Sequence, residues 1–399
     1  MDKFSLRTGP AFIITAAFIG PGSLTVCALA GVDFGFELLW AVLFSCLITI
    51  FLQNIVAGLS HKYNLGLIEL LKKKVYGKRL KSFFIGYILL TIFFGNTAYQ
   101  AGNISGSLIG LNKLLEIITP EFSQLINPFL LLIIGVILIS IILKQNIKLL
   151  KTILGIAVLL MSVSFLIAAI LTKPNLNDLL YGFFIPRWRP ETWSTIVAVL
   201  GTTIVPYNLF LHAWLVKKER SKNINFDSFK KDTIIAVSFG GIISTSIVIA
   251  AAGANINELV SIDDLGTSLH NLYGQKSELF ISLGLFSAGL SSALTAPLAA
   301  AFIVQESLNE YSSKRKLQII VPILIIVSGL IFTFLDSNPF NLIRLAQILN
   351  GLMLPGITLF ISYLYFSVQK NSFDFKIRIF GLLLLFLFFT FLAFKILFL

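Results

Sequence analysis

The chain has 399 residues, of which 56% are hydrophobic and 13% are charged, and its formal net charge is +12. A soluble domain carries roughly 25% charged residues, so this composition excludes an ordinary soluble fold and indicates a membrane protein. The basic residues lie in short segments between apolar runs, where they act as orientation signals rather than as a nucleic-acid surface. Cys27 and Cys46 both lie in apolar runs, which argues against a disulfide framework and against a thiolate metal cluster.

Apolar runs of about 20 residues recur along almost the whole chain, and each is long enough to cross roughly 30 Å of hydrocarbon. The first run has no small-residue cleavage site, so we expect a retained helix rather than a signal peptide. In chain order the expected spans are residues 9–32, 36–60, 82–112, 127–143, 149–172, 193–216, 231–254, 277–309, 318–335, 340–367 and 377–398. The predicted fold is therefore all-α, with about eleven transmembrane helices in one polytopic domain over residues 1–399.

The basic residues are distributed unequally between the two sides of the membrane. If the N-terminus is cytoplasmic, most of the 31 Lys and Arg residues fall in segments on the cytoplasmic side. This bias predicts a multi-pass protein of the cytoplasmic cell membrane, with its N-terminus inside and its C-terminus outside. We expect a monomer whose partners are the lipid bilayer and a transported ion or small molecule.

Two of the expected spans are interrupted at their middle by helix-breaking residues. The first span contains Gly20-Pro21-Gly22-Ser23, and the sixth contains Val205-Pro206-Tyr207-Asn208. The prolines remove backbone donors and free carbonyl groups, which hydrocarbon tolerates only where those groups line a cavity or bind something. One proline alone would more simply be a kink, but two breaks five spans apart favour a midplane binding site. They predict a first repeat, an inverted second repeat and one extra helix, at residues 9–172, 193–367 and 377–398 respectively.

Four segments resemble the Nramp (natural resistance-associated macrophage protein) family of divalent metal transporters. Residues 18–23 resemble its Asp-Pro-Gly-Asn signature in helix one, and residues 205–212 resemble its Met-Pro-His-Asn-Leu-Tyr-Leu-His in helix six. Residues 289–295 resemble its Gly-Gln-Ser-Ser-Thr-Ile-Thr in helix eight, and residues 346–347 with 354–355 resemble its helix ten. The resemblance covers most of the chain and implies the leucine-transporter fold, with unwound helices one and six and transport by alternating access.

The sequence departs from the family at the positions that hold the metal. The aspartate of the family signature falls on Gly20, its asparagine on Ser23, its methionine on Val205 and its helix-six histidine on Tyr207. The charged and soft side-chain ligands of the family are thus missing. Manganese or iron transport therefore does not transfer directly to this chain, since transition metals favour nitrogen or sulfur ligands.

Three further residues are candidates for gating or for a proton path. Gln100 and Asn103 stand where the family places the helix-three Asp and Glu that take part in proton transfer, so we expect weak or no proton coupling. His212 matches a histidine of the family motif, and imidazole titrates near neutral pH. A gating or proton-carrying His212 and a buried, hydrogen-bonded one remain equally open.

The predicted substrate site collects polar and backbone groups near the two breaks and in span ten. Its expected members are Ala17, Gly20, Ser23, Thr202, Val205, Tyr207, Asn208 and Gln347. If the substrate is a metal, the expected donors are Gly20, Ser23, Thr202 and Gln347. Neutral oxygen donors suit a hard cation that keeps several waters, such as Mg²⁺. They also suit a solute that brings its own charges, because the ends of broken helices can hold a carboxylate.

Other polar residues have simpler interpretations. Asn208 is compatible with an N-cap of the second half of helix six as well as with substrate contact. We expect Glu69 and Glu306, beside Lys clusters, to be solvated or paired. Asp33 and Glu37 are expected to solvate the outer turn rather than to attract cations to a vestibule. The cluster of Ser291, Ser292 and Thr295 is expected to serve helix packing rather than to line the pathway, as small and hydroxyl residues commonly do in membranes.

The sequence predicts a secondary transporter of a divalent cation, Mg²⁺ or Mn²⁺-like and partly hydrated. A transporter of a small organic solute such as an amino acid is the alternative, and a non-transporting sensor or scaffold is a weaker one. Enzyme motifs such as His-Glu-x-x-His, Gly-x-Ser-x-Gly and the P-loop do not occur in the sequence, so we expect neither an enzyme nor a cofactor.

Overall fold

The computed structural model describes residues 19–119, 127–144, 148–220, 225–254, 258–259, 261–308, 314–335, 338–369 and 373–398, and these residues contain helices and connections but no strand. In chain order the helices are α2 (Pro21–Phe34), α3 (Leu39–Tyr63), α4 (Leu67–Lys74), α5 (Lys78–Ile118), α6 (Asn127–Lys144), α7 (Lys148–Leu171), α8 (Leu176–Phe184), η2 (Pro190–Thr192), α9 (Trp193–Thr203), α10 (Pro206–Arg220), α11 (Phe226–Ala252), α12 (Ile262–Thr267), α13 (His270–Tyr273), η3 (Gly274–Lys276), α14 (Ser277–Leu308), α15 (Lys314–Leu335), α16 (Pro339–Val368) and α17 (Phe373–Phe398).

The helices follow the expected spans closely. Within the described residues, eight helical segments are long and apolar enough to cross a membrane, and three shorter apolar helices lie where the first, fourth and fifth spans were expected. The prediction of an all-α polytopic fold is confirmed. Short helices such as α4 and α8 were not predicted, because their few apolar residues lie on one face and do not form a long apolar run.

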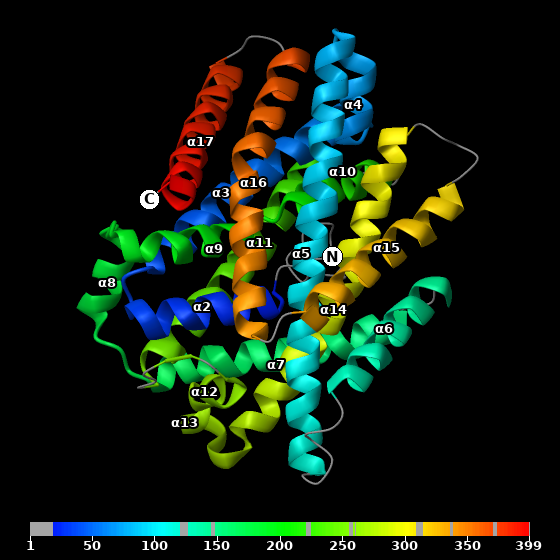
Figure 1. Ribbon diagram of the computed structural model, residues 1–399. Coiled ribbons are helices and arrows are strands. Elements are labelled where there is room, and N and C mark those ends of the chain that lie inside the picture. The colour runs from blue at the N-terminus through cyan, green and yellow to red at the C-terminus, as the bar shows by residue number, and fades with distance from the viewer. Residues whose placement is uncertain are drawn as a thin grey trace, which may run out of the picture.

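The 41-residue helix α5 runs through the middle of the molecule from one end to the other and packs against α14, α15 and α16 (Figure 1). Glycines allow this close packing. A Cβ atom at Gly110 would lie 2.5 Å from the backbone nitrogen of Phe286 on α14, and one at Gly106 would lie 2.4 Å from the Cβ of Pro21 on α2. Small residues at helix contacts let backbones approach closely in membranes, so α5 holds α2 and α14 together.

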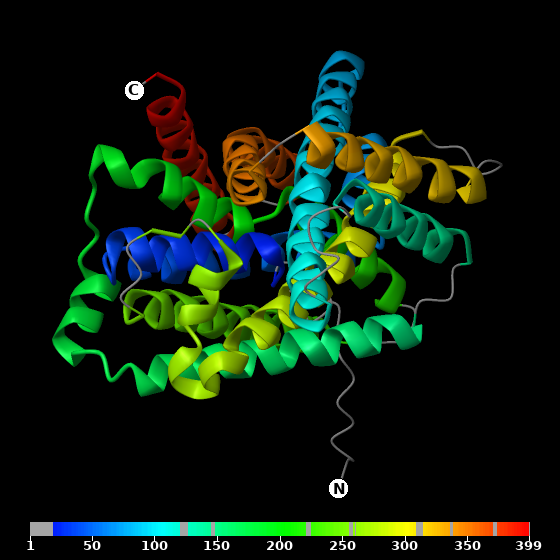
Figure 2. The same cartoon turned by 60° about the horizontal axis from the view of Figure 1, so that its bottom comes forward.

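The outer helices flank this centre on two sides. The helices α6 and α15 pack together at one edge, whereas α17 stands near α16 at the opposite edge (Figures 1 and 2). Large apolar side chains of α17 are exposed, including Phe380 at 63% and Leu387 at 61%. This exposure is the pattern of a helix that faces lipid.

Candidate substrate site at the two helix breaks

The sixth span is interrupted where the sequence predicts. The helix α9 ends at Thr203, where the backbone N–H of Ile204 donates to Leu200 at 2.8 Å, and α10 begins at Pro206. Proline has no N–H and suits the first position of a helix, where no intrahelical acceptor is available for that group. The last carbonyl groups of α9 and the first N–H groups of α10 therefore meet at Val205, inside the protein.

The first span has a helix start at the corresponding place. The helix α2 begins at Pro21 after Gly20 in an extended conformation. The hydroxyl of Ser23 accepts from the N–H of Gly20 and donates to its carbonyl oxygen, both at 3.0 Å. The predicted site residue Ala17 lies outside the described residues. Ser23 thus fixes the start of α2 and keeps one acceptor lone pair for a further contact.

The two breaks are brought together through two tyrosines. A Cβ atom at Gly20 would lie 2.9 Å from the hydroxyl oxygen of Ser292 and 3.7 Å from that of Tyr99. The ring of Tyr99 meets the ring of Tyr207 edge to face, with centroids 5.6 Å apart. Gly20, on the first break, and Tyr207, on the second, are therefore linked through Tyr99 of α5.

Gln347 of α16 joins the two breaks on another side. A Cβ at Gly22 would lie 2.2 Å from its side-chain nitrogen, and a Cβ at Gly201 would lie 2.0 Å from its carbonyl oxygen. Any side chain at either glycine would collide with Gln347. The structure thus places Gln347 between α2 and α9, as a residue that lines a shared site would be.

The site is buried and neutral, yet several of its polar atoms make no hydrogen bond. Within the described residues, these groups include the hydroxyl of Thr202, both side-chain heteroatoms of Asn208 and the side-chain oxygen of Gln347. Leaving such a group unpaired costs roughly 1–3 kcal/mol. The described residues hold no group of three or more His, Cys, Asp or Glu side chains that could bind a metal. The donors are therefore neutral oxygens and amides with bonding capacity to spare.

The helix-three candidates are buried next to Tyr99: Gln100 follows it directly, and Asn103 lies about one turn further along α5. Gln100 donates from its side-chain nitrogen to the carbonyl of Ala293 on α14 at 3.0 Å. Asn103 is buried beside Gly289, whose Cβ would lie 2.6 Å from the carbonyl of Asn103. Gln100 thereby ties α5 to α14, and neither residue carries a group that exchanges protons near neutral pH.

The comparisons with known proteins agree with this architecture. A family model described as natural resistance-associated macrophage protein-like matches residues 11–397. The chain belongs to this Nramp family. It is 26% identical over 380 residues to natural resistance-associated macrophage protein 2 homolog of Dictyostelium discoideum, covering 89% of this chain and 57% of the relative. It is 28% identical over 358 residues to the divalent metal cation transporter MntH of Bacillus subtilis, covering 85% of this chain and 79% of that one.

Solved structures establish the fold of this Nramp chain. The manganese transporter of Eremococcus coleocola, in complex with an aromatic bis-isothiourea compound, aligns with a TM-score of 0.73 at 18% identity, over 96% of this chain and 84% of that one. Mhp1, a nucleobase-cation-symport-1 family transporter, aligns with a TM-score of 0.61 at 14% identity, over 97% of this chain and 90% of that one. The family resemblance and the all-α polytopic transporter fold are confirmed.

Some local predictions for this Nramp chain are wrong. Asn208 does not cap α10, because Pro206 takes the first helical position and Asn208 becomes its third residue. For His212, neither ring nitrogen has a hydrogen-bond partner within the described residues, so the hydrogen-bonded interpretation is not supported.

Sequence reasoning missed Tyr99, Gly22 and Gly201. Gly22 lay within the quoted break, and Tyr99 directly precedes Gln100. Small residues next to a helix break permit a close contact, and this rule would have suggested Gly22 and Gly201. No sequence pattern indicates that Tyr99 reaches both Gly20 and Tyr207.

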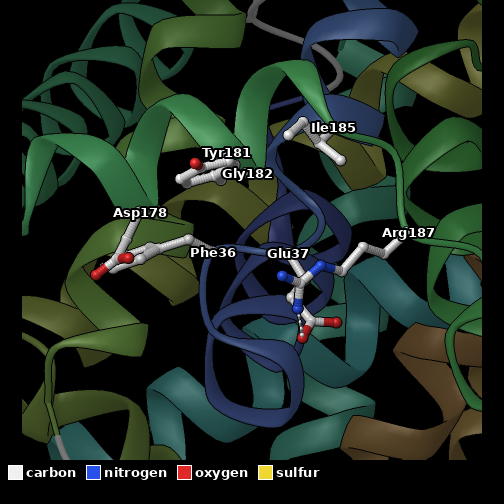
Figure 3. A pocket seen from close by; sticks show the side chains of 7 residues that line it. All are labelled: Phe36, Glu37, Asp178, Tyr181, Gly182, Ile185 and Arg187. Atoms are coloured by element: carbon white, nitrogen blue, oxygen red, sulfur yellow. Dashed lines mark hydrogen bonds and ion pairs between the residues drawn. The ribbon is translucent and has the colours of Figure 1, made fainter.

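A cavity of about 190 Å³ lies between the turn that joins α2 to α3 and the helix α8 (Figure 3). Glu37 lines it and faces Arg187, which donates to its carboxylate at 2.9 Å, and Arg189 pairs with the other carboxylate oxygen. The prediction that Glu37 merely solvates the turn is wrong. Two guanidinium groups neutralise this carboxylate, so it is not a free cation ligand.

The opposite, Lys-rich end has a second polar network around α4. The carboxylate of Glu69 accepts from Lys217 of α10 at 2.5 Å and from the N–H of Gly66 at 3.1 Å. Burial raises the pKa of Glu69, but the Lys217 hydrogen bond, the Gly66 N–H and nearby lysine charges outweigh it and hold the pKa below its ordinary 4.5. Glu69 is thus paired, as predicted. Glu306 is not solvated, because one of its carboxylate oxygens is buried with no hydrogen-bond partner in the described part of the chain.

Proposed function

We propose that this chain is a secondary transporter that carries a divalent metal cation across the membrane by alternating access. The cation is Mg²⁺ or a Mn²⁺-like ion that keeps part of its water shell. Membership of the Nramp family supports a metal substrate, and relatives such as MntH of Bacillus subtilis are described as divalent metal cation transporters. The observation that most directly supports the proposal is the set of buried, neutral polar groups without hydrogen-bond partners where the two breaks meet.

The chemistry of these groups favours a hydrated ion over a bare one. Thr202, Gln347 and the backbone near Gly20 supply neutral oxygens, and the last turn of α9 adds carbonyl groups at the negative end of its dipole. Mg²⁺ gives up water reluctantly and is bound through a few protein oxygens plus several retained waters. The unpaired side-chain amide of Asn208 is available to bind such waters.

The proposal includes weak or absent proton coupling. Gln100 and Asn103 are amides, so the helix-three positions carry no proton that a gradient could drive. Alternating access in this proposal uses two inverted repeats, residues 9–172 and 193–367, that move about the shared site. Helix α17 lies outside both repeats.

The test is uptake by proteoliposomes that contain the purified chain. We expect internal Mg²⁺- or Mn²⁺-sensitive dyes to report uptake while an internal pH dye reports little or no change. Protein-free liposomes provide the control for leakage. If no divalent ion enters under any gradient, the cation proposal is rejected.

A small organic solute remains the second candidate, because α2 and α10 both begin at this site. Their N-terminal ends carry the positive end of the helix dipole and suit a carboxylate group. Thermal unfolding across a panel of metals and amino acids separates the two candidates, since only a ligand of the folded state raises the melting temperature. A shift with metals and none with amino acids would eliminate the solute.

A further inference from the structure

The Lys-rich end of the molecule has a groove between α3, α11 and α17, and its lining includes none of the residues at the helix breaks. Two adjoining cavities, of about 230 and 370 Å³, share Ile55, Asp374 and Arg378. We propose that this groove binds an anionic phospholipid, with the phosphate at Arg378 and Lys230 and an acyl chain along α3. The proposal does not depend on what the protein transports.

The wall that α3 contributes is a continuous stripe. Its lining residues recur every three or four positions, which places them on one face of a helix: Leu47, Ile50, Phe51, Asn54, Ile55, Gly58, Leu59, His61 and Lys62. From residue 47 to residue 62 the stripe extends about 22 Å at 1.5 Å per residue. It changes from apolar to polar along its length, and an acyl chain with its headgroup has the same order.

The apolar end of the groove opens to the lipid-facing surface. Leu47, at this end, is 55% exposed, and Ile377, next to Arg378 on α17, is 54% exposed, although both are large apolar side chains. Phe51 packs on Gly381, whose Cβ would lie 2.9 Å from the ring. This contact brings α17 against α3 at Phe51. The groove between the two helices lies on the Arg378 side of this contact.

The polar end presents a recessed guanidinium group. The side chain of Arg378 is 26% exposed, whereas that of its partner Asp374 is 68% exposed, so the arginine lies in the groove and the aspartate at its rim. The Nε atom of Arg378 donates to Asp374 at 3.1 Å, and its two terminal nitrogens make no hydrogen bond within the described residues. A guanidinium group with two free NH₂ groups matches the geometry of a phosphate.

A second cation lies on the neighbouring wall. The Nζ atom of Lys230 on α11 is 3.8 Å from a carboxylate oxygen of Asp227, too far for a hydrogen bond, and lies 5.1 Å from the ring centroid of Phe226. Lys230 and Arg378 line the same cavity. Basic pockets between transmembrane helices near the Lys-rich membrane surface bind anionic headgroups. A zwitterionic headgroup would bring a further positive charge to this site, so phosphatidylglycerol fits better than phosphatidylcholine.

The test measures lipid binding to the full chain purified in detergent. We expect phosphatidylglycerol to raise the melting temperature more than phosphatidylcholine of the same acyl length, and to survive as a bound adduct in native mass spectrometry. The double variant Arg378→Gln with Lys230→Gln should bind phosphatidylglycerol roughly tenfold or more weakly. Lys78→Gln is the matched control, because Lys78 is exposed at the start of α5, on the same side, and lines neither cavity.

Two further measurements keep the proposal falsifiable. Glycerol 1-phosphate, which has the anionic group without acyl chains, should not reproduce the shift. If it does, the site takes a free phosphate and the lipid assignment is wrong. Should the double variant fail to fold, competition between the two lipids for the wild-type chain decides by itself. Equal retention of phosphatidylcholine and phosphatidylglycerol would overturn the proposal.

Discussion

At the residue scale, two glycines determine how closely the broken helices approach Gln347. Gly201 matters most, because the atom that its Cβ would meet is a backbone carbonyl oxygen, which cannot rotate away. The side-chain nitrogen that faces Gly22 belongs to a flexible amide and can move. Interhelical contact at Gly201 therefore tolerates substitution less well than contact at Gly22.

Gly201→Ala should separate α9 from α16 and destabilise the fold. Overpacking of this kind costs about 1–3 kcal/mol, so we expect a lower melting temperature and a loss of uptake. Gly86→Ala is the matched control, because a Cβ at Gly86 meets nothing within 4 Å and alanine favours the helix. Equal melting temperatures for the two variants would contradict the close contact at Gly201.

Asn208→Asp changes the charge of the site at nearly constant shape. If the substrate is a divalent cation, a carboxylate close to it should tighten binding by about tenfold, or about 1.4 kcal/mol. If the substrate offers a carboxylate to the α10 N-terminus, the same change should weaken binding through repulsion. Competition uptake assays measure the direction, and Asn177→Asp, on the exposed surface of α8, controls for added charge. Weaker cation uptake would count against the proposed function.

At the element scale, α4 connects parts of the chain that are far apart in sequence. Lys72 donates to the carbonyl oxygen of Glu306 at 3.0 Å and also to that of Ser307, so it satisfies the C-terminal end of α14. Burial lowers the pKa of Lys72, although Glu306 and Glu69 oppose this shift. With the Glu69–Lys217 pair, α4 thus ties α3 and α5 to α10 and α14.

Glu69→Gln should weaken this connection and remove its pH dependence. The folded-state pKa of Glu69 lies below its ordinary 4.5, so its contribution to stability is present above that value and is lost as the pH falls through the folded-state pKa. We expect the variant to lose about 1 kcal/mol at neutral pH, as for a lost helix cap. Its melting temperature should fall less than that of the wild type between about pH 6 and about pH 3.

Glu116→Gln controls for the loss of a carboxylate. Glu116 is 54% exposed and pairs with Lys113 at 3.5 Å, and exposed pairs contribute about 0–1 kcal/mol. Parallel acid profiles for the wild type and Glu69→Gln, measured by thermal unfolding, would show that Glu69 does not stabilise the fold through its charge.

At the scale of the whole molecule, the predicted orientation places α4 in the cytoplasm and α8 outside. Both native cysteines are buried, so single introduced cysteines report accessibility with little background. A membrane-impermeant maleimide should label Asn177→Cys in intact cells and Lys78→Cys only after permeabilisation. Both positions are exposed. Labelling in the reverse order would show that the chain has the opposite orientation.

The sequence by itself determined the membrane class, the all-α fold, the family and the interruption of the sixth span. These follow from local properties: apolar runs of membrane length, the basic bias of the loops, and prolines that cannot continue a helix. The break at Val205–Pro206 needs no distant partner, and for that reason it was predictable within a residue.

Only the tertiary structure decided which groups meet. Tyr99 reaches both breaks, Gln347 lies between Gly22 and Gly201, Glu37 finds two arginines, and Arg378 lines the groove beside α3. Each contact joins residues far apart in the chain, and its formation depends on helix crossing and rotation. No local propensity or periodicity fixes those quantities; they are set by how ridges and small residues of neighbouring helices pack.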